Sequence, residues 1–137
     1  MGKPTERTLK LLKQTGFQSG IVERFIRGAG PFGKHFDLFG IGDLISMGNG
    51  QIWLVQSCGA DFKPHHIKLT TEEPAAENLK EWLSNGGLFV LIGWRHLLKK
   101  RGGKAKYYRP RIRIYKLARD IVFYKDVDAD FEHWFLN

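Results

Sequence analysis

Hydrophobic and polar residues alternate along the chain in patterns that predict two helices and a series of strands. Residues 5–16 place leucines on one helical face between a threonine cap and a terminal glycine, so they predict a helix. Residues 73–83 have similar spacing and predict a second helix. Runs rich in β-branched and aromatic residues predict strands at 20–26, 43–47, 51–56, 88–94, 107–115 and 121–124. This order predicts an α/β fold, with a central mixed β-sheet flanked by helices.

The segment Gly48-Asn49-Gly50 separates two of these strands, and Asn-Gly is typical of a two-residue hairpin turn. In that register the numbers of cross-strand partners sum to 99, which places Asp43 opposite Gln56. Because side chains alternate along a strand, Cys58 shares a face with Gln56. Three chemically active side chains are therefore expected at one end of the hairpin.

A glycine-rich loop at residues 28–33 matches the letters of the dinucleotide fingerprint G-x-G-x-x-G. That fingerprint needs a helix directly after the loop. Here Pro31 lies inside the loop and strand-like residues 36–39 follow it. We therefore expect no nucleotide site there, and no small-molecule cofactor.

The composition fits one folded domain over residues 1–137. Of the 137 residues 42% are hydrophobic and 13% aromatic, which is globular rather than disordered. The one cysteine, Cys58, excludes a disulfide framework and a multi-cysteine zinc site. No apolar run approaches the roughly 18 residues of a membrane helix, and from the charged helical pattern at the start we expect no secretory segment. We expect a cytoplasmic protein with no membrane partner, from a cell or a virus.

The charge pattern indicates a polyanionic partner. The net charge is +8, and residues 95–119 carry eleven of the 22 Lys and Arg residues with no acid among them. Residues 107–115 alternate arginine and tyrosine on one strand face, which suits phosphate contact by arginine with stacking by tyrosine. The expected DNA-contacting residues are Lys34, His35, Arg95, Lys99, Lys100, Arg101, Lys104, Arg109, Arg111 and Arg113.

Residues 37–43, Asp-Leu-Phe-Gly-Ile-Gly-Asp, are followed by Val55-Gln56 on the next strand. Together with the first helix and the glycine-rich loop, this order resembles the PD-(D/E)XK nuclease superfamily, and within it the Holliday junction resolvase-like branch. The resemblance covers roughly residues 5–95. It implies a restriction-endonuclease-like fold with an αβββαβ core. It also implies a symmetric homodimer that acts on DNA.

The resemblance assigns roles to individual residues. In this superfamily an aspartate on the hairpin and an acid on the next strand bind the metal, and a lysine two residues further on orients or activates water. By resemblance, Asp43 is a ligand of Mg²⁺ or Mn²⁺, Gln56 occupies the position of the second acid, and Cys58 occupies the position of the lysine. Gln56 can still ligate through its amide oxygen, whereas Cys58 cannot replace an ammonium group. Lys68 is the expected substitute for that lysine, with Lys63 second. Glu23 is the expected further metal-binding carboxylate, and Glu6 competes with it.

Each of these residues also has a structural interpretation. Asp43 could terminate a strand, Gln56 could make a structural hydrogen bond, and Glu23 could pair with an arginine. Asp37 lies about 20 Å from Asp43 on a straight strand, so the two can share one ion only if Gly40 and Gly42 make a sharp bend. Asp37 is therefore ranked as structural, or as a residue that supports a metal ligand without binding the ion itself. Cys58 could be a buried packing residue. His65 and His66 could be a solvated pair or could contact phosphate.

These observations lead to a first hypothesis of a metal-dependent DNA endonuclease that is structure-selective on branched DNA. Phe131, Trp134 and Phe135 would form a dimer contact or pack on their own sheet. The alternative is a catalytically inactive nucleic-acid-binding module on the same fold, which the residues Gln56 and Cys58 support. A third interpretation is a basic subunit that binds an acidic protein.

Overall fold

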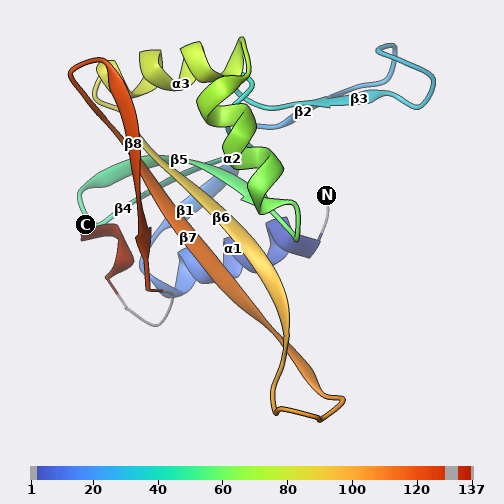
Figure 1. Cartoon of the computed structure of the whole chain (residues 1–137). Helices are drawn as coiled ribbons and strands as arrows, with labels where there is room; N and C mark the ends of the chain where they lie inside the picture. The colour runs from blue at the N-terminus through green and yellow to red at the C-terminus, as the bar shows by residue number, and fades with distance from the viewer. Residues whose placement is uncertain (1–2, 129–132, 137) are drawn as a thin grey trace.

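The computed structural model describes residues 3–128 and 133–136, which form a mixed sheet covered by helices on both faces (Figure 1). Its helices are α1 (Lys3–Gln14), α2 (Phe62–Thr71) and α3 (Ala75–Ser84), followed by the 3-10 turn η1 (Trp134–Leu136). Its strands are β1 (Gln18–Ile21), β2 (Arg24–Ile26), β3 (Lys34–Phe36), β4 (Leu44–Gly48), β5 (Gln51–Cys58), β6 (Leu88–Leu98), β7 (Lys106–Ala118) and β8 (Ile121–Val127).

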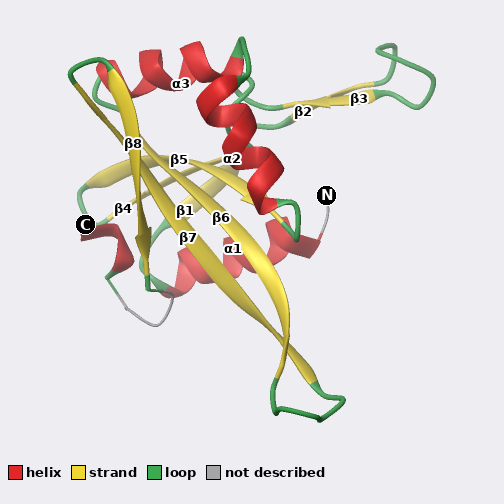
Figure 2. Cartoon of the chain, in the orientation of Figure 1, coloured by secondary structure: helices red, strands yellow, loops and turns green. Residues whose placement is uncertain are grey.

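The main sheet has six strands in the order β1-β4-β5-β6-β7-β8. Strands β5 and β6 run parallel because α2 and α3 form the crossover between them, and the other neighbouring pairs are antiparallel. Helix α1 covers one face, and α2 and α3 cover the other (Figure 2). The predicted single-domain α/β class with a mixed sheet is confirmed.

The predicted hairpin register is also confirmed. Gly48 pairs with Gln51, and the ladder continues to Leu44 and Val55. Asn49 and Gly50 both have positive φ angles, +53° and +76°, as a two-residue turn of this kind requires. Beyond the ladder, the Asp43 N–H donates to the Val55 carbonyl at 2.9 Å, so Asp43 lies at the end of the hairpin.

Gly48 lies where the hairpin meets the end of α1, and we expect Gly48→Ala to destabilise the fold. An added Cβ would lie 2.3 Å from the Gly16 carbonyl oxygen, a backbone atom that cannot move aside cheaply. Overpacking of this kind costs about 1–3 kcal/mol. Gly20→Ala on neighbouring β1 is the control, because its Cβ would meet nothing within 4 Å. Urea unfolding measures both, and equal stability of the two variants would contradict this packing.

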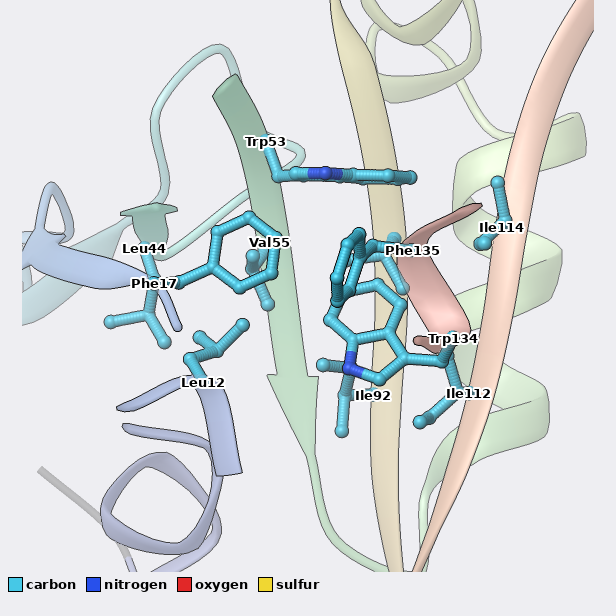
Figure 3. Packing of buried hydrophobic residues seen from close by; sticks show 11 residues of the cluster. Leu12, Phe17, Leu44, Trp53, Val55, Ile92, Ile112, Ile114, Trp134 and Phe135 are labelled. Carbon is cyan, nitrogen blue, oxygen red and sulfur yellow. The ribbon is translucent and has the colours of Figure 1, made fainter. Parts of the chain in front are cut away.

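Two clusters of buried residues lie on the two faces of the sheet. The first joins Leu12 of α1 and Phe17 to Trp53, Ile92 and Ile112, among others (Figure 3). The second joins residues of α2 and α3 to the opposite face, with Leu54, Phe89, Leu91 and Tyr115 on the sheet side. The alternation along β5 therefore divides its apolar residues between the two cores.

The prediction of one strand at residues 20–26 is wrong in one respect, because two separate strands, β1 and β2, cover this segment. β1 joins the main sheet, whereas β2 pairs with β3 (Figure 1). Between them the N–H groups of Val22 and Glu23 both donate to the Asp43 carbonyl, which turns the chain away from the sheet. A run of β-branched residues predicts extended chain but does not show which partner each part pairs with. Residues 24–36, which include β2 and β3, are called the arm below.

Helix α2 occupies a segment for which the sequence pattern predicts neither a helix nor a strand. Phe62 and Leu69 are its buried residues, so its apolar stripe is narrow. Pro64 lies in the first turn, where a missing N–H disturbs no helical hydrogen bond. The first helix also differs slightly, since it begins at Lys3 and buries Thr5 instead of being capped by it.

Strands β6 and β7 continue beyond their predicted ends at residues 94 and 107. Their pairing extends to Leu98 and Lys106, and the hairpin they form projects from the body of the sheet (Figure 2). A turn at residues 99–105 closes it, with the Lys99 N–H donating to the Ala105 carbonyl at 2.9 Å.

The aromatic residues near the C-terminus pack on their own sheet. Trp134 and Phe135 are buried, and the Trp134 ring lies 5.8 Å from that of Phe17 and 5.5 Å from that of Trp53 (Figure 3). The sequence left open a dimer contact or packing on the chain's own sheet, and the structure shows the packing for Trp134 and Phe135. Phe131 lies outside the described residues. Within residues 3–128 and 133–136, no helix has the length and apolar character to cross a membrane.

Candidate active site

A cleft of about 760 Å³ opens where the end of β5, the start of α1, helix α2 and the base of the arm meet. It receives the four residues predicted as catalytic, which come from four separate segments of the chain. These are Glu23, Asp43, Gln56 and Lys68. The folded chain therefore brings together the residues that the sequence pattern singles out, and the predicted DNA-contacting Lys34 and His35 line the same cleft.

Asp43 is buried at the floor of the cleft. Its Oδ1 accepts a hydrogen bond of 3.0 Å from the Ser57 backbone N–H. Burial raises the pKa of its carboxyl from 3.8 to about 7, the Ser57 hydrogen bond opposes the rise, and the charges of Asp37 and Glu23 add to it. Burial makes the charged form of Asp43 unfavourable, and a cation placed beside the carboxylate would stabilise that form.

Asp37 reaches the cleft through a sharp turn. The Leu38 N–H donates to the Gly42 carbonyl at 2.7 Å, and Phe39 and Gly40 adopt φ angles of +56° and +70°. The chain therefore bends between Gly40 and Gly42, as it must if Asp37 and Asp43 are to lie at the same site. Asp37 lines the cleft and its charge raises the pKa of Asp43, which agrees with the expectation that it supports the site from beside a metal ligand.

Glu23 is mostly buried at the foot of the arm. Its Oε1 lies 2.5 Å from His35 Nδ1, so its partner is a histidine instead of the arginine considered from the sequence. Glu6, the competing carboxylate, is exposed on α1 and is not among the residues lining the cleft. Of these two carboxylates, Glu23 is the one that lines the cleft.

Gln56 and Ser57 connect the cleft floor to α1. The buried Gln56 Nε2 donates to the Ser57 carbonyl at 3.1 Å, which fixes the plane of the amide. The Ser57 hydroxyl accepts a hydrogen bond from Thr8, and Thr8 accepts one from the Trp94 indole. This network is absent from the sequence-based prediction, because threonine inside an amphipathic helix gives no signal of its partner.

Lys68 lies on the face of α2 that lines the cleft, whereas Lys63 is exposed and is not among the lining residues. Glu72 and Glu73 line the cleft as well, at the junction of α2 and α3. The cleft is thus rich in carboxylates although the whole protein carries a net charge of +8.

A second group of potential metal ligands lies in the same cleft. Ligand atoms of Cys58, Asp61 and His65 lie within 4.8 Å of one another. Burial raises the pKa of the Cys58 thiol to about 12, helped by the charges of Asp61 and Asp43, which disfavours the thiolate that a nucleophile or a metal ligand requires. The i,i+4 spacing of Asp61 and His65 would have revealed this group had α2 been recognised as a helix.

The two adjacent histidines of α2, expected to be a solvated or phosphate-binding pair, are partly buried and each has a partner within the protein. His65 Nδ1 lies 2.8 Å from the Asp61 carbonyl oxygen. His66 Nδ1 lies 2.6 Å from the Tyr115 hydroxyl, and burial lowers its pKa. Both imidazoles are therefore engaged within the protein, as follows from neighbouring residues of a helix pointing about 100° apart.

The arginine face of β7 is only partly open to a ligand. Arg113 is buried, and its guanidinium pairs with the Asp126 carboxylate through contacts of 2.7 and 3.0 Å. Arg111 lies over the Phe62 ring at 4.2 Å, and Arg109 lies 3.6 Å from Asp128. The expectation that Arg113 contacts DNA is wrong, because β8 places an acid across the strand from it.

The exposed basic residues concentrate on the β6–β7 hairpin. Arg95, Lys99, Lys100, Arg101 and Lys104 are all exposed. They remain available for phosphate contact in the way that the charge pattern predicts.

Comparisons with protein-family models, curated proteins and solved structures gave no match to this chain.

Proposed function

We propose that the protein is a divalent-metal-dependent DNA endonuclease, a member of the PD-(D/E)XK superfamily with a restriction-endonuclease-like fold. The observation that carries this is the buried Asp43, which shares one cleft with Glu23, Gln56 and Lys68. When β2, β3 and α2 are set aside, the order α1-β1-β4-β5-α3-β6 is compatible with the αβββαβ core that the resemblance implies, which supports the proposed fold.

The donor set fits a hard cation. Carboxylate oxygens of Asp43 and Glu23 and the amide oxygen of Gln56 are the kind of ligand that Mg²⁺ and Mn²⁺ take. When bound, such an ion polarises a phosphate and lowers the pKa of a water molecule. Asp43 is held for this role by Ser57, and Gln56 is held by its own hydrogen bond to the Ser57 carbonyl.

Lys68 orients the attacking water and offsets the charge that develops on the phosphate. It lines the cleft from α2, opposite the β-sheet residues. The exposed cations of the β6–β7 hairpin, together with Lys34 and His35, hold the phosphate backbone. Selectivity for branched DNA and a homodimer that cuts paired strands complete the proposal.

We expect Lys68→Met to reduce the cleavage rate by about 100- to 1,000-fold, the range that a positioned charge or hydrogen-bond donor contributes. Lys63→Met on the exposed side of the same helix is the matched control and leaves the rate unchanged. Single-turnover cleavage at saturating protein measures both. Equal rates for the two variants would remove Lys68 from the mechanism.

Cleavage of labelled DNA tests the function itself. Linear duplex, single-strand, flap and four-way junction substrates are each incubated with Mg²⁺, Mn²⁺ or EDTA. The proposal predicts cleavage that requires the metal and is fastest on the branched substrates. Absence of cleavage on all four, with every metal, would contradict it.

A catalytically inactive binding module is the second candidate, because Gln56 brings no charge to the site and Cys58 replaces the lysine that the resemblance implies. It predicts DNA binding that weakens steeply as salt rises and that EDTA does not change. Such binding without cleavage would favour this candidate over the enzyme.

A further inference from the structure

The arm exposes apolar side chains among cations. Residues 24–36 contain Arg24, Arg27, Lys34 and His35 and no aspartate or glutamate. Phe25 is 51% exposed, and Phe32 at the tip is 92% exposed. Because a solvated phenylalanine forgoes the stabilisation of burial, this surface suits a partner that is both anionic and flat-faced.

Pairing within the arm interleaves the two kinds of side chain. Among the described residues, β2 and β3 pair with each other and stand apart from the main sheet (Figure 1). Ile26 pairs with Lys34, and Phe25 pairs with His35, so each face presents an apolar side chain beside a basic one. The rings of Phe25 and His35 lie 4.8 Å apart, which makes a small platform.

Glycines shape the tip of the arm. Gly30 and Gly33 adopt φ angles of +97° and +80°, which other residues rarely tolerate. A Cβ on Gly33 would lie 2.3 Å from the Phe25 ring, so glycine lets that ring cover the backbone. With Phe25 held against the arm, Phe32 is left as the exposed ring at its end.

The base of the arm is also a wall of the cleft. Lys34, His35 and Phe36 of the arm line it, together with the flanking Glu23 and Asp37, so the cleft at Asp43 is continuous with the base of the arm. Arginine and lysine contact phosphates, and aromatic rings stack on bases whatever their sequence. Bases inside an intact duplex are already stacked, so an aromatic tip finds partners where bases are unpaired.

We propose that the arm is a binding site for unpaired nucleotides at the branch point of DNA. Phe32 stacks on an exposed base, and Arg27 and Lys34 contact the adjoining phosphates. The arm thereby gives the protein its preference for branched over linear DNA. This inference rests on the proposed function in requiring DNA as the substrate.

Binding measurements with EDTA present test the arm separately from cleavage. Fluorescence anisotropy compares a four-way junction, a single strand and a linear duplex of equal length. Phe32→Ala is expected to weaken binding to the junction and the single strand by about tenfold, and to the duplex by less than about twofold. A 2-aminopurine base at the branch point is expected to lose its quenching with the variant. Phe123→Ala on β8, where the ring is 45% exposed, is the matched control and leaves all three affinities unchanged.

The outcomes separate the two proposals. Wild-type protein that binds none of the three DNAs overturns the proposed function and the arm together. Wild-type protein that binds DNA, with affinities that Phe32→Ala leaves unchanged, overturns the arm alone. A lower sedimentation mass of Phe32→Ala with unchanged DNA affinity assigns the arm to contact between two copies of the chain, and also overturns it.

Discussion

Asp43→Asn is expected to stabilise the metal-free protein at pH 8 while removing its response to divalent ions and its cleavage activity. The asparagine keeps an oxygen that can accept the Ser57 N–H and no longer buries a charge. A pKa raised from 3.8 to about 7 corresponds to roughly 4 kcal/mol at most. Cleavage is expected to fall more than about 100-fold, since a bound cation contributes several kcal/mol to such reactions.

The pH dependence of this effect follows from the direction of the shift. Below about pH 4 Asp43 is protonated in the folded and the unfolded chain, and its titration does not affect stability. Between about pH 4 and pH 7 the unfolded chain releases the proton and the folded chain keeps it, so the free energy of unfolding falls as pH rises. Above about pH 7 both are ionised and the loss is complete.

Thermal unfolding from pH 4 to pH 9, without and with Mn²⁺, measures this. The wild-type protein loses stability relative to Asp43→Asn as the pH rises to about 7, and Mn²⁺ restores part of the loss. A constant difference between the two proteins across this range would show that Asp43 is not buried in the way described.

Trp134→Ala is expected to destabilise the protein by about 3–5 kcal/mol, the usual effect of removing a fully buried tryptophan. Its ring contacts Phe17 and Trp53 on the α1 face of the sheet, so its loss leaves a large cavity in that core. Chemical denaturation measures the change.

Leu136→Ala in the same 3-10 turn is the matched control, because that side chain is 66% exposed. It is expected to change stability by less than about 0.5 kcal/mol. If Trp134→Ala instead dissociates a dimer and leaves the monomer as stable as before, the C-terminal aromatic residues belong to an interface and not to this core.

The sequence predicts the hairpin and the sheet well because their signals are local. Asn49-Gly50 defines the turn, and the turn alone fixes the register that aligns Asp43 with the end of β5. The apolar run of β6 likewise indicates burial on both faces, which the two cores confirm.

What the sequence does not predict depends on partners far along the chain. Residues 20–26 form one extended run, and its division between two sheets is decided by hydrogen bonds to Asp43. Arg113 belongs to an acid-free segment, yet β8 brings Asp126 across from it. Charge read along a segment misses a pair that the sheet register creates.

The candidate site follows the same division. Asp43 and Gln56 are identified from one hairpin, whereas Asp37 reaches the cleft through a turn that two positive φ angles make possible. Cys58, Asp61 and His65 come together because α2 forms, and the weak apolar stripe of α2 conceals it in the sequence. The sequence therefore predicts the positions of site residues that lie within one hairpin. It does not predict which distant segments pack together, because tertiary contacts determine that.

The binding of Mn²⁺ tests the central claim most directly, since every role assigned to the cleft depends on a cation at Asp43. Electron paramagnetic resonance of free Mn²⁺, titrated with wild-type protein and with Asp43→Asn, counts bound ions without any DNA. The wild-type protein is expected to remove the free-ion signal, with an affinity that increases as the pH rises to about 7, and Asp43→Asn is expected to leave the signal intact. Equal binding by the two proteins, or none by either, would contradict the account.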